Sequence, residues 1–263
     1  MAEALFSIRD LRVEVADMTR KPLLGAAPPL EILKGISLDI ARGTVLGIVG
    51  GSGSGKTTLG RTLVRLMEPT GGTIVFDSRD ITHISEARMR PLRPRIQMIF
   101  QDPMSSLNPR LTIGRIIAAP LGARTGDPRV AEALDHVGLP PEMARRYPHE
   151  LSGGQRQRVG IARAIARRPD FILADEIVSG LDVSSQAQIL NLLGQLVEEL
   201  GLTLAFISHD LSVIRRLCSR VMVMQGGVIV EDGPTANLFE APSHPYTREL
   251  LDSIPVPDPS VRW

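Results

Sequence analysis

Apolar and polar positions follow several different periods along the first part of the chain. Residues 5–15 and 32–40 alternate apolar and polar positions, which predicts half-buried strands. Residues 44–50 form a continuous apolar run that ends in glycine, which is typical of a buried central strand. Apolar residues of segment 59–67 then recur at helical spacing, until Pro69 and a glycine pair end the predicted helix.

Strands and helices alternate regularly in the second half of the chain. The predicted strands from the middle of the chain onward are 73–76, 96–100, 171–174, 203–208 and 220–224. The predicted helices of the second half are 154–168, 184–200 and 211–217. Such alternation implies a mostly parallel sheet that is covered by helices on both faces. Ligands of such sheets bind at the carboxyl ends of the strands.

Residues 102–150 have a different character. Proline and glycine punctuate short helical pieces, such as 113–119 and 129–137. Because apolar residues still recur there, we expect a helical insert rather than a linker.

Composition excludes several classes of protein. Of 263 residues, 43% are apolar, enough for a packed core, and the net charge of +1 gives no electrostatic argument for nucleic-acid binding. The single cysteine, Cys218, excludes an intramolecular disulfide and lies in an apolar setting that predicts a buried, unreactive thiol. No apolar run approaches the roughly 20 residues of a membrane span, and the N-terminus lacks the pattern of a secretory signal. We therefore expect a cytosolic protein that reaches membranes only through a partner.

A glycine-rich loop follows the buried strand and fits the pattern G-x-x-x-x-G-K-[ST]. Glycines let successive backbone N–H groups surround a phosphate, a lysine reaches the β- and γ-oxygens, and a threonine hydroxyl can ligate Mg²⁺. An ordinary Gly/Ser-rich turn is the alternative, but the strand before the loop and the helix after it favour nucleotide binding. The residues predicted to bind ATP here are Gly50, Gly51, Ser52, Gly53, Ser54, Gly55, Lys56, Thr57 and Thr58.

Two carboxylates end the apolar strand at 171–174. Asp175 suits an indirect holder of Mg²⁺, and Glu176 suits a general base that orients the attacking water. An acidic cap on the following turn is the alternative. The phosphate loop upstream favours catalysis.

Three further groups belong to the predicted site. Gln101 follows the strand at 96–100, so its amide oxygen could complete a Mg²⁺ shell and sense the γ-phosphate. His209 follows the strand at 203–208 and could bond the same phosphate. The glycine-rich turn Ser152, Gly153, Gly154 and Gln155 opens a basic helix, a second phosphate-binding feature. The other histidines (His83, His136, His149 and His244) have no metal-ligand spacing and are interpreted as structural or surface groups.

These motifs, in this order, make the chain resemble the ATP-binding cassette (ABC) ATPases over nearly its whole length. GGSGSGKTT is similar to the Walker A loop, LSGGQ to the family signature, ILADE to Walker B, and SGLD to the D-loop. Gln101 corresponds to the Q-loop and His209 to the switch histidine, while Ser179 and Asp182 are the D-loop residues. The flanking segments QDPMSSLNPR, LDVSSQAQILNLL and HPYTRELLDSIP resemble the dipeptide and oligopeptide importer ATPases, a group that also serves nickel and metallophore uptake.

The resemblance implies a fold and a set of partners. It implies a RecA-like P-loop NTPase fold, α/β with a mostly parallel sheet, an antiparallel β subdomain and an inserted α-helical subdomain. The expected parts of this single ABC ATPase domain, 1–263, are a catalytic core with the β subdomain (1–101 and 151–232), the helical insert (102–150) and a C-terminal extension (233–263). ATP and Mg²⁺ are the implied cofactors.

The implied assembly is a head-to-tail dimer, of two copies or two different chains, in which each ATP lies between one P-loop and the partner's signature. Two transmembrane permease subunits dock on the insert, and a solute-binding protein outside the membrane acts indirectly. The expected location is therefore the cytoplasmic face of the cell membrane, with peripheral attachment and no nucleic-acid partner.

Three positions depart from the family pattern. Val15 stands where an aromatic residue usually stacks on adenine, which predicts weaker ATP binding unless another residue, for instance from the Pro-rich loop at 21–30, replaces it. Ile177 replaces the usual proline after the base, and Gly180 replaces the usual alanine of the D-loop.

Two other functions also use a P-loop. A soluble cassette protein could clamp a cytosolic partner such as DNA or the ribosome, but such proteins often carry two cassettes or a coiled-coil insert. A small-molecule kinase has no evident use for LSGGQ.

Overall fold

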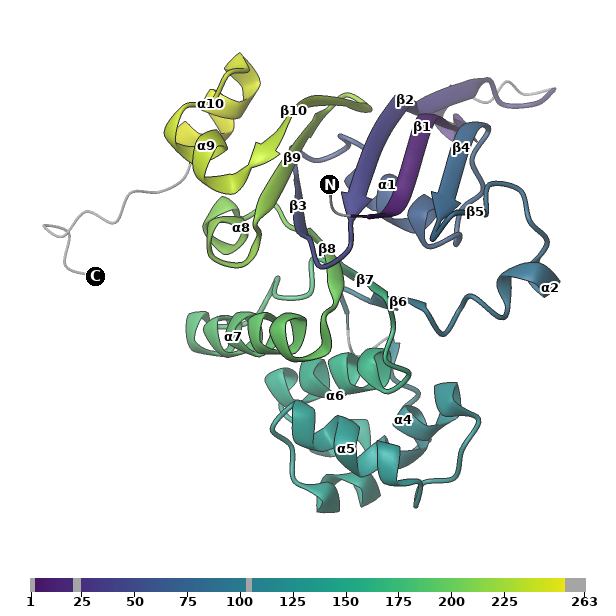
Figure 1. Ribbon diagram of the computed structural model, residues 1–263, viewed down its shortest axis with the longest axis vertical. Coiled ribbons are helices and arrows are strands. Elements are labelled where there is room, and N and C mark those ends of the chain that lie inside the picture. The colour runs from purple at the N-terminus through teal and green to yellow at the C-terminus, as the bar shows by residue number, and fades with distance from the viewer. Residues whose placement is uncertain (1–2, 21–24, 103–105, 254–263) are drawn as a thin grey trace, which may run out of the picture.

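The computed structural model describes residues 3–20, 25–102 and 106–253. It contains a six-stranded sheet and a four-stranded sheet, with the short α2 (Glu86–Met89) and 3-10 helix η1 (Met18–Arg20) in connections (Figure 1). The predicted fold class, a mostly parallel α/β sheet with an added antiparallel sheet and inserted helices, is confirmed.

The six-stranded sheet contains the continuous apolar runs. Its strand order is β10-β9-β3-β8-β7-β6, parallel except for the antiparallel pair β10 and β9. The strands are β3 (Val45–Val49), β6 (Ile96–Ile99), β7 (Phe171–Asp175), β8 (Thr203–Ile207), β9 (Arg220–Gln225) and β10 (Val228–Pro234). Every residue of β3, β7 and β8 is buried, because helices or the second sheet cover both faces. The carboxyl ends of the parallel strands share one edge, where the site forms.

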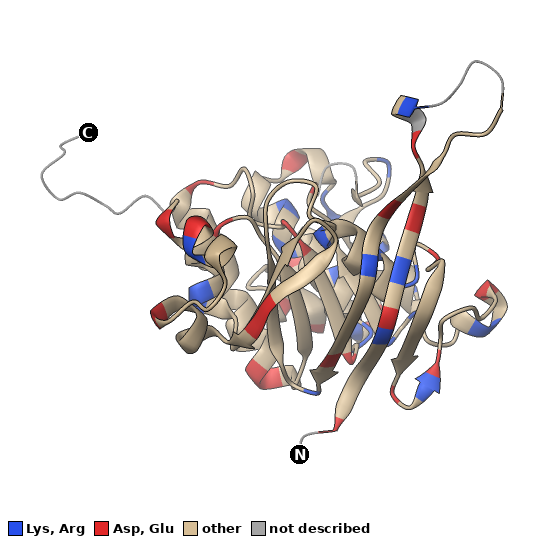
Figure 2. Cartoon of the chain, turned by 90° about the horizontal axis from the view of Figure 1, so that it is seen from above, with Lys and Arg blue, Asp and Glu red and all other residues tan. Residues whose placement is uncertain are grey.

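The antiparallel sheet has the order β2-β1-β4-β5. Its strands are β1 (Ala4–Ala16), β2 (Pro29–Ala41), β4 (Gly71–Phe76) and β5 (Arg79–Asp80). Phe6 packs against Phe76 and against Phe171 of the large sheet, with ring centroids 4.9 and 4.8 Å away, so aromatic contacts join the two sheets. The exposed face of β1 and β2 carries charges of both signs (Figure 2), which pair across the strands, as Arg9 does with Asp39.

Successive residues of the central strands point to opposite cores. Leu46 and Ile48 of β3 join a core with α1 (Lys56–Leu63) and the antiparallel sheet. Val45 and Val49 join the core on the other face, which is built by α6 (Gly153–Ile165), α7 (Val183–Leu200) and α8 (Leu211–Leu217). Cys218 is buried in this second core, and burial raises the pKa of its thiol to about 12, which confirms the prediction of a buried thiol.

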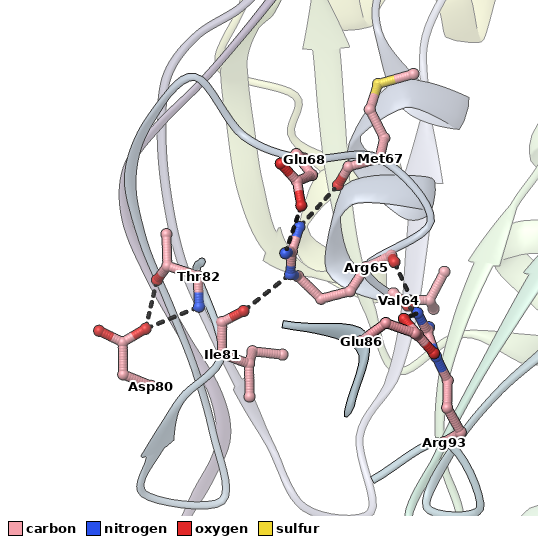
Figure 3. Close-up of polar contacts among 9 residues, drawn as sticks. All are labelled: Val64, Arg65, Met67, Glu68, Asp80, Ile81, Thr82, Glu86 and Arg93. Carbon is pink, nitrogen blue, oxygen red and sulfur yellow. Dashed lines mark hydrogen bonds and ion pairs between the residues drawn. The ribbon is translucent and has the colours of Figure 1, made fainter. Parts of the chain in front are cut away.

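The helix after the phosphate loop is shorter than predicted. Segment 59–67 has helical spacing, but α1 ends at Leu63, and Arg65 has a left-handed φ of 56°. The Arg65 guanidinium donates to the carbonyl of Ile81 at 2.8 Å, and Arg93 donates to the carbonyls of Val64 and Arg65 at 2.7 and 3.0 Å (Figure 3). These bonds satisfy the carbonyls at the helix end and hold a turn in place of another helical turn.

The described part of the segment between β6 and α6 contains several helices, as predicted. It contains α4 (Ile113–Leu121), α5 (Pro128–His136) and the 3-10 turns η2 (Pro141–Arg145) and η3 (Pro148–Glu150), and α4 and α5 pack against α6. These helices lie at the end of the molecule opposite the antiparallel sheet (Figure 1).

The sequence did not predict the elements after β9. The chain forms β10 and then two short helices, α9 (Thr235–Glu240) and α10 (Pro245–Asp252), here called the C-terminal helix pair. Glu231 of β10 binds the turn between these helices: its carboxylate accepts bonds from Ser243 N, Ser243 Oγ and His244 N at 2.8, 2.9 and 3.1 Å. Partial burial alone would raise the pKa of Glu231, but the Thr247 hydroxyl and these hydrogen bonds outweigh it and hold the pKa at about 2.

The low pKa of Glu231 predicts how the stability of the protein depends on pH. Because its folded pKa of about 2 lies below the ordinary 4.5, its contribution is present above pH 4.5 and is lost as the pH falls toward 2. We expect Glu231→Gln to lower the urea midpoint at pH 6, and the difference from wild type to shrink between pH 5 and 3. Glu240→Gln, on the exposed face of α9, is the control for loss of a carboxylate. A difference that stays constant with pH would contradict this role for Glu231.

Candidate active site

The glycine loop connects β3 to α1. Gly50, Gly53 and Gly55 have φ values of 150°, 75° and 99°, which side chains with a Cβ rarely adopt. A Cβ at Gly50 would lie 2.2 Å from the carbonyl oxygen of Met224, so the loop can pass β9 only with glycine there. The loop therefore forms a tight backbone cradle at the N-terminus of α1.

The Lys56 ammonium lies inside this cradle. Lys56 is only 8% exposed, and its Nζ donates to the carbonyl oxygens of Gly50 and Gly51 at 2.7 and 2.9 Å. Burial lowers the pKa of Lys56, and the negative charges of Glu176 and Asp175 partly oppose that shift. A buried cation near the open end of a loop of N–H groups is suited to bind an anion.

A cavity of about 490 Å³ adjoins the loop. Its lining is made by Ile32, Ser52, Gly53, Ser54, Gly55, Lys56, Thr57, Thr58, Glu176 and His209. The buried Ser54 Oγ has no hydrogen-bond partner among the described residues. The loop, the ammonium and this free hydroxyl fit the phosphate chain of a nucleotide.

Gln101 and His209, two of the predicted site residues, meet at the carboxylate of Glu176, the predicted base. Gln101 Nε2 donates to Glu176 Oε2 at 3.1 Å, and His209 Nδ1 lies 3.4 Å from Glu176 Oε1. Ser179 Oγ donates to the Glu176 carbonyl at 2.7 Å. Glu176 itself has a left-handed φ of 49°, an uncommon conformation that costs free energy and is found mainly at functional sites. The ends of β6, β7 and β8 thus contribute one carboxylate and its two flanking groups.

Asp175, the residue before Glu176, lies next to Thr57 in the first turn of α1. It is buried, and Thr57 Oγ1 donates to its Oδ1 at 3.4 Å. Burial and the neighbouring charge of Glu176 raise the pKa of Asp175, while the bond from Thr57 lowers it. A hydroxyl and a carboxylate are hard oxygen donors that fit Mg²⁺. Gln101 was predicted to join this set, but its recorded contacts are with Glu176 and Ser179 instead.

The signature residues form a second feature, separate from the cavity. Ser152 caps α6: Gln155 N donates to Ser152 Oγ at 3.3 Å, and Ser152 N donates to Gln155 Oε1 at 3.0 Å. A Cβ on Gly154 would lie 3.7 Å from Ser185 Oγ, in the first turn of α7. Asp182 caps that helix, and its carboxylate accepts from Ser185 N at 2.9 Å. The signature and the D-loop therefore lie together, and neither lines the cavity.

Two of the three departures from the family pattern have a local explanation, and the third, Val15, lies in an exposed aliphatic pair. Ile177 is buried in the core, so packing anchors the turn that a proline would otherwise stiffen. Gly180 has a φ of 79°, a conformation that strains alanine. Val15 is 36% exposed and pairs across the strands with Leu30, which is 46% exposed. Leu30 is the last residue of the Pro-rich loop, of which residues 21–24 lie outside the described part.

Two residues at the site were not predicted from the sequence. Ile32 lines the cavity from β2, and the Tyr246 hydroxyl accepts a bond from Gly51 N at 2.7 Å. For Ile32, alternation along the strand predicts on which face of the sheet the side chain lies, but not that the phosphate loop lies next to it. For Tyr246, the motif HPYT was noted only as a family resemblance.

A buried strand, a glycine loop, a helix and an acidic strand end together define a P-loop ATPase. The family model described as ABC transporter matches residues 33–179, and the one described as the oligopeptide/dipeptide transporter C-terminal region matches residues 230–263. The chain belongs to the ABC transporter family of ATP-binding proteins.

Several relatives are similar over most of the chain. A peptide import ATP-binding protein of Brucella ovis is 52% identical over 93% of this chain and 82% of its own length. The oligopeptide transport ATP-binding protein AppF of Bacillus subtilis is 50% identical over 86% of this chain and 71% of its own. The glutathione import ATP-binding protein GsiA of Salmonella paratyphi A is 53% identical over 87% of this chain, which spans 38% of that longer protein.

Solved structures support the fold. The dimeric ATP-binding cassette MJ0796 in a post-hydrolysis state with ADP and Pi has a TM-score of 0.76 at 30% identity, covering 88% of this chain and 98% of that one. CbiO1 of Clostridium perfringens, part of the transporter complex cbiONQ, has a TM-score of 0.77 at 28% identity, covering 91% and 92%. In residues 3–20, 25–102 and 106–253, no helix combines the length and apolar character that a bilayer crossing requires.

Proposed function

We propose that this chain is the ATP-hydrolysing subunit of an ABC importer, powering uptake of peptides or related small solutes such as nickel or metallophores. The observation that carries the proposal is the Glu176 carboxylate, which lines the P-loop cavity between Gln101 and His209. The names of the relatives, which include peptide, oligopeptide and glutathione import proteins, support the importer class.

The chemistry assigned to the site is attack of water on the γ-phosphate of ATP. Glu176 orients the water and accepts its proton as the bond to ADP breaks, and His209 holds the terminal phosphate. The residues assigned to the triphosphate are Gly50, Gly51, Ser52, Gly53, Ser54, Gly55, Lys56, Thr57, Thr58 and Gln101. Mg²⁺, when bound by Thr57, Asp175 and Gln101, would neutralise the charge that develops on the phosphate oxygens.

ATP hydrolysis is coupled to movement through a dimer. The signature residues Ser152, Gly153, Gly154 and Gln155 are assigned to the γ-phosphate held by the partner subunit, and Ser179 and Asp182 to the seam between subunits. ATP contacts both subunits, whereas ADP has lost the phosphate that reaches the signature, so hydrolysis favours the open state. The separation of the signature from this chain's own cavity supports the assignment.

An aliphatic surface is assigned to the adenine ring. Ile32 lines the cavity, and Leu30 lies two residues earlier on β2. Val15 pairs with Leu30 across the strands, so Val15 and Leu30 share one face of the sheet. Exposed aliphatic carbons there can cover an adenine face by van der Waals contact, with less stabilisation than an aromatic ring provides.

A groove beside Gln101 is assigned to the permease. It has a volume of about 280 Å³ and is lined by Val64, Leu66, Arg93, Ile96, Gln97, Met98, Phe100, Pro120 and Arg163. Leu66 is 55% exposed on the turn that Arg65 and Arg93 hold, and Phe100 is 41% exposed next to Gln101. Exposed apolar side chains in a groove are typical of protein contact sites. A helix seated here would contact the residue before Gln101, which links docking to the site. With the permease docked in this groove, the chain is assigned to the cytoplasmic face of the membrane.

Co-purification tests the proposed function. Tagged wild-type chain, extracted with detergent from its own cells, should hydrolyse ATP and recover two polytopic membrane proteins. Leu66→Asp should lose those proteins by at least about tenfold while the isolated subunit keeps its ATPase rate, because a charge in the groove opposes apolar docking. Ala236→Asp, on the exposed face of α9, is the control and should keep both. Recovery of only soluble partners would favour the cytosolic clamp instead.

A further inference from the structure

The C-terminal helix pair reaches the P-loop directly. Tyr246, at the start of α10, accepts a hydrogen bond on its hydroxyl from Gly51 N, with 2.7 Å between the two atoms. The residues are 195 positions apart in the sequence. A Cβ at position 51 would lie 2.9 Å from the same oxygen, so a side chain there would push the Tyr246 hydroxyl away.

The Gly51 residue is held through both of its backbone groups. Its N–H donates to Tyr246, while its carbonyl accepts from Lys56 Nζ at 2.9 Å and from Ser54 N at 3.3 Å. The Lys56 ammonium is thus held by two carbonyls, that of Gly50 at 2.7 Å and that of Gly51, and the second depends on how Gly51 is oriented. Tyr246 does not line the cavity, so it acts on the phosphate site through the loop.

The position of Tyr246 is fixed from the opposite side. Its own N–H donates to His244 Nδ1 at 3.2 Å, and Pro245 occupies the first turn of α10. Glu231 binds the backbone of Ser243 and His244, which ties this helix start to β10. Tyr246 and Leu250 also pack against the core that α6, α7 and α8 build on one face of the large sheet. The hydroxyl thus reaches Gly51 from a firmly held helix.

We propose that Tyr246 is a positioning residue that pre-organises the P-loop for ATP, with the C-terminal helix pair as its support. Without the hydroxyl, the Gly51 residue can turn and Lys56 loses one of the two carbonyl oxygens that hold it. The loop then has to be ordered when the triphosphate binds, which weakens binding and leaves the hydrolytic groups around Glu176 unchanged. The affinity part of this inference rests on the proposed function, whereas the contact between Tyr246 and Gly51 does not.

Tyr246→Phe, which removes only the hydroxyl, is the direct test. In the nucleotide-free protein, amide hydrogen exchange of the segment containing Gly51 should accelerate. The KM for Mg·ATP should rise by about 2- to 10-fold, the range that one lost hydrogen bond gives, with kcat within about twofold of wild type. Glu231→Gln should move both measurements in the same direction, by less. Ser253→Ala removes a hydroxyl bond at the other end of the same helix and should change neither.

The outcomes separate the inference from the proposed function. Unchanged exchange at Gly51 in Tyr246→Phe overturns the inference, as does a fall in kcat at unchanged KM. A protein that binds no ATP at all overturns the proposed function, and the exchange measurement still decides whether Tyr246 holds the loop. A thermal unfolding midpoint that matches wild type shows that loss of the hydroxyl has not simply loosened the fold, and Tyr246→Ala provides a second, larger truncation with the same expected direction.

Discussion

Glu176→Gln is expected to reduce ATP hydrolysis by about 10²- to 10⁴-fold, the contribution typical of a general base. The amide has nearly the same shape and can still bond Gln101 and His209, but it accepts no proton. ATP binding should therefore survive, and the variant should accumulate as a closed dimer because the γ-phosphate is not removed. Phosphate release under steady state and size-exclusion chromatography in Mg·ATP measure the two effects.

The control for this variant is Glu198→Gln on α7, which removes a carboxylate outside the cavity lining and should keep the wild-type rate. Turnover at the wild-type rate by Glu176→Gln would show that another group accepts the proton. A variant that stays monomeric in saturating Mg·ATP, alone and with any sister cassette, would contradict the shared nucleotide site.

The central strands were predictable because their signals are local. Buried parallel strands read as unbroken apolar runs, so β3, β7 and β8 could be placed from the sequence within one or two residues. Parallel alternation also predicted that the P-loop, Glu176 and His209 would converge on one edge, because each follows a strand of one sheet. The hydrogen bonds between these side chains depend on side-chain orientation, which the periodicity of the sequence does not predict.

The errors came from tertiary interactions that override local pattern. Leu66 has helical spacing with Leu59 and Leu63, yet the carbonyls after α1 bond to Arg93 and the chain turns instead. Tyr246 contacts a loop 195 residues away, a distance at which a single sequence gives no pairing signal. Both cases concern polar side chains that bond to the backbone of a distant segment.

The same reasoning explains why Ile177 and Gly180 are tolerated. The family motif has proline and alanine at these two positions, whereas this chain forms the same turn with other residues. Packing of Ile177 in the core supports the turn after Glu176, and glycine at 180 accommodates a φ of 79°. We infer that the buried side chain of Ile177 anchors the turn between Glu176 and the D-loop, and that Gly180 allows this turn its positive φ.

Mixing two inactive variants gives the sharpest test of the shared site. Lys56→Ala disables the P-loop, and Gly153→Asp places a negative charge where the partner's γ-phosphate is expected, so each alone should fall below about 1% of wild-type turnover. Gly153 has room for a side chain, since the nearest atom to an added Cβ is 3.9 Å away on Leu181, and folding should survive. Each mixed dimer contains one site with both parts intact.

A 1:1 mixture should therefore regain activity, up to about a quarter of wild type if self-paired dimers exchange freely and the two sites act independently, because half the dimers are mixed and each has one working site. The matched control is a mixture of Lys56→Ala with the double variant Lys56→Ala, Gly153→Asp, in which no dimer has an intact P-loop. Recovery in the first mixture alone requires that P-loop and signature come from different subunits. Exchange of subunits is verified by size-exclusion chromatography of differently tagged chains. If both mixtures are equally inactive, there are two explanations: one working site cannot turn over while its partner site is disabled, or the site is not shared. Photolabelling with an azido-ATP then distinguishes these two explanations. If the site is shared, protection of the bound nucleotide by the partner's signature should appear only in the first mixture.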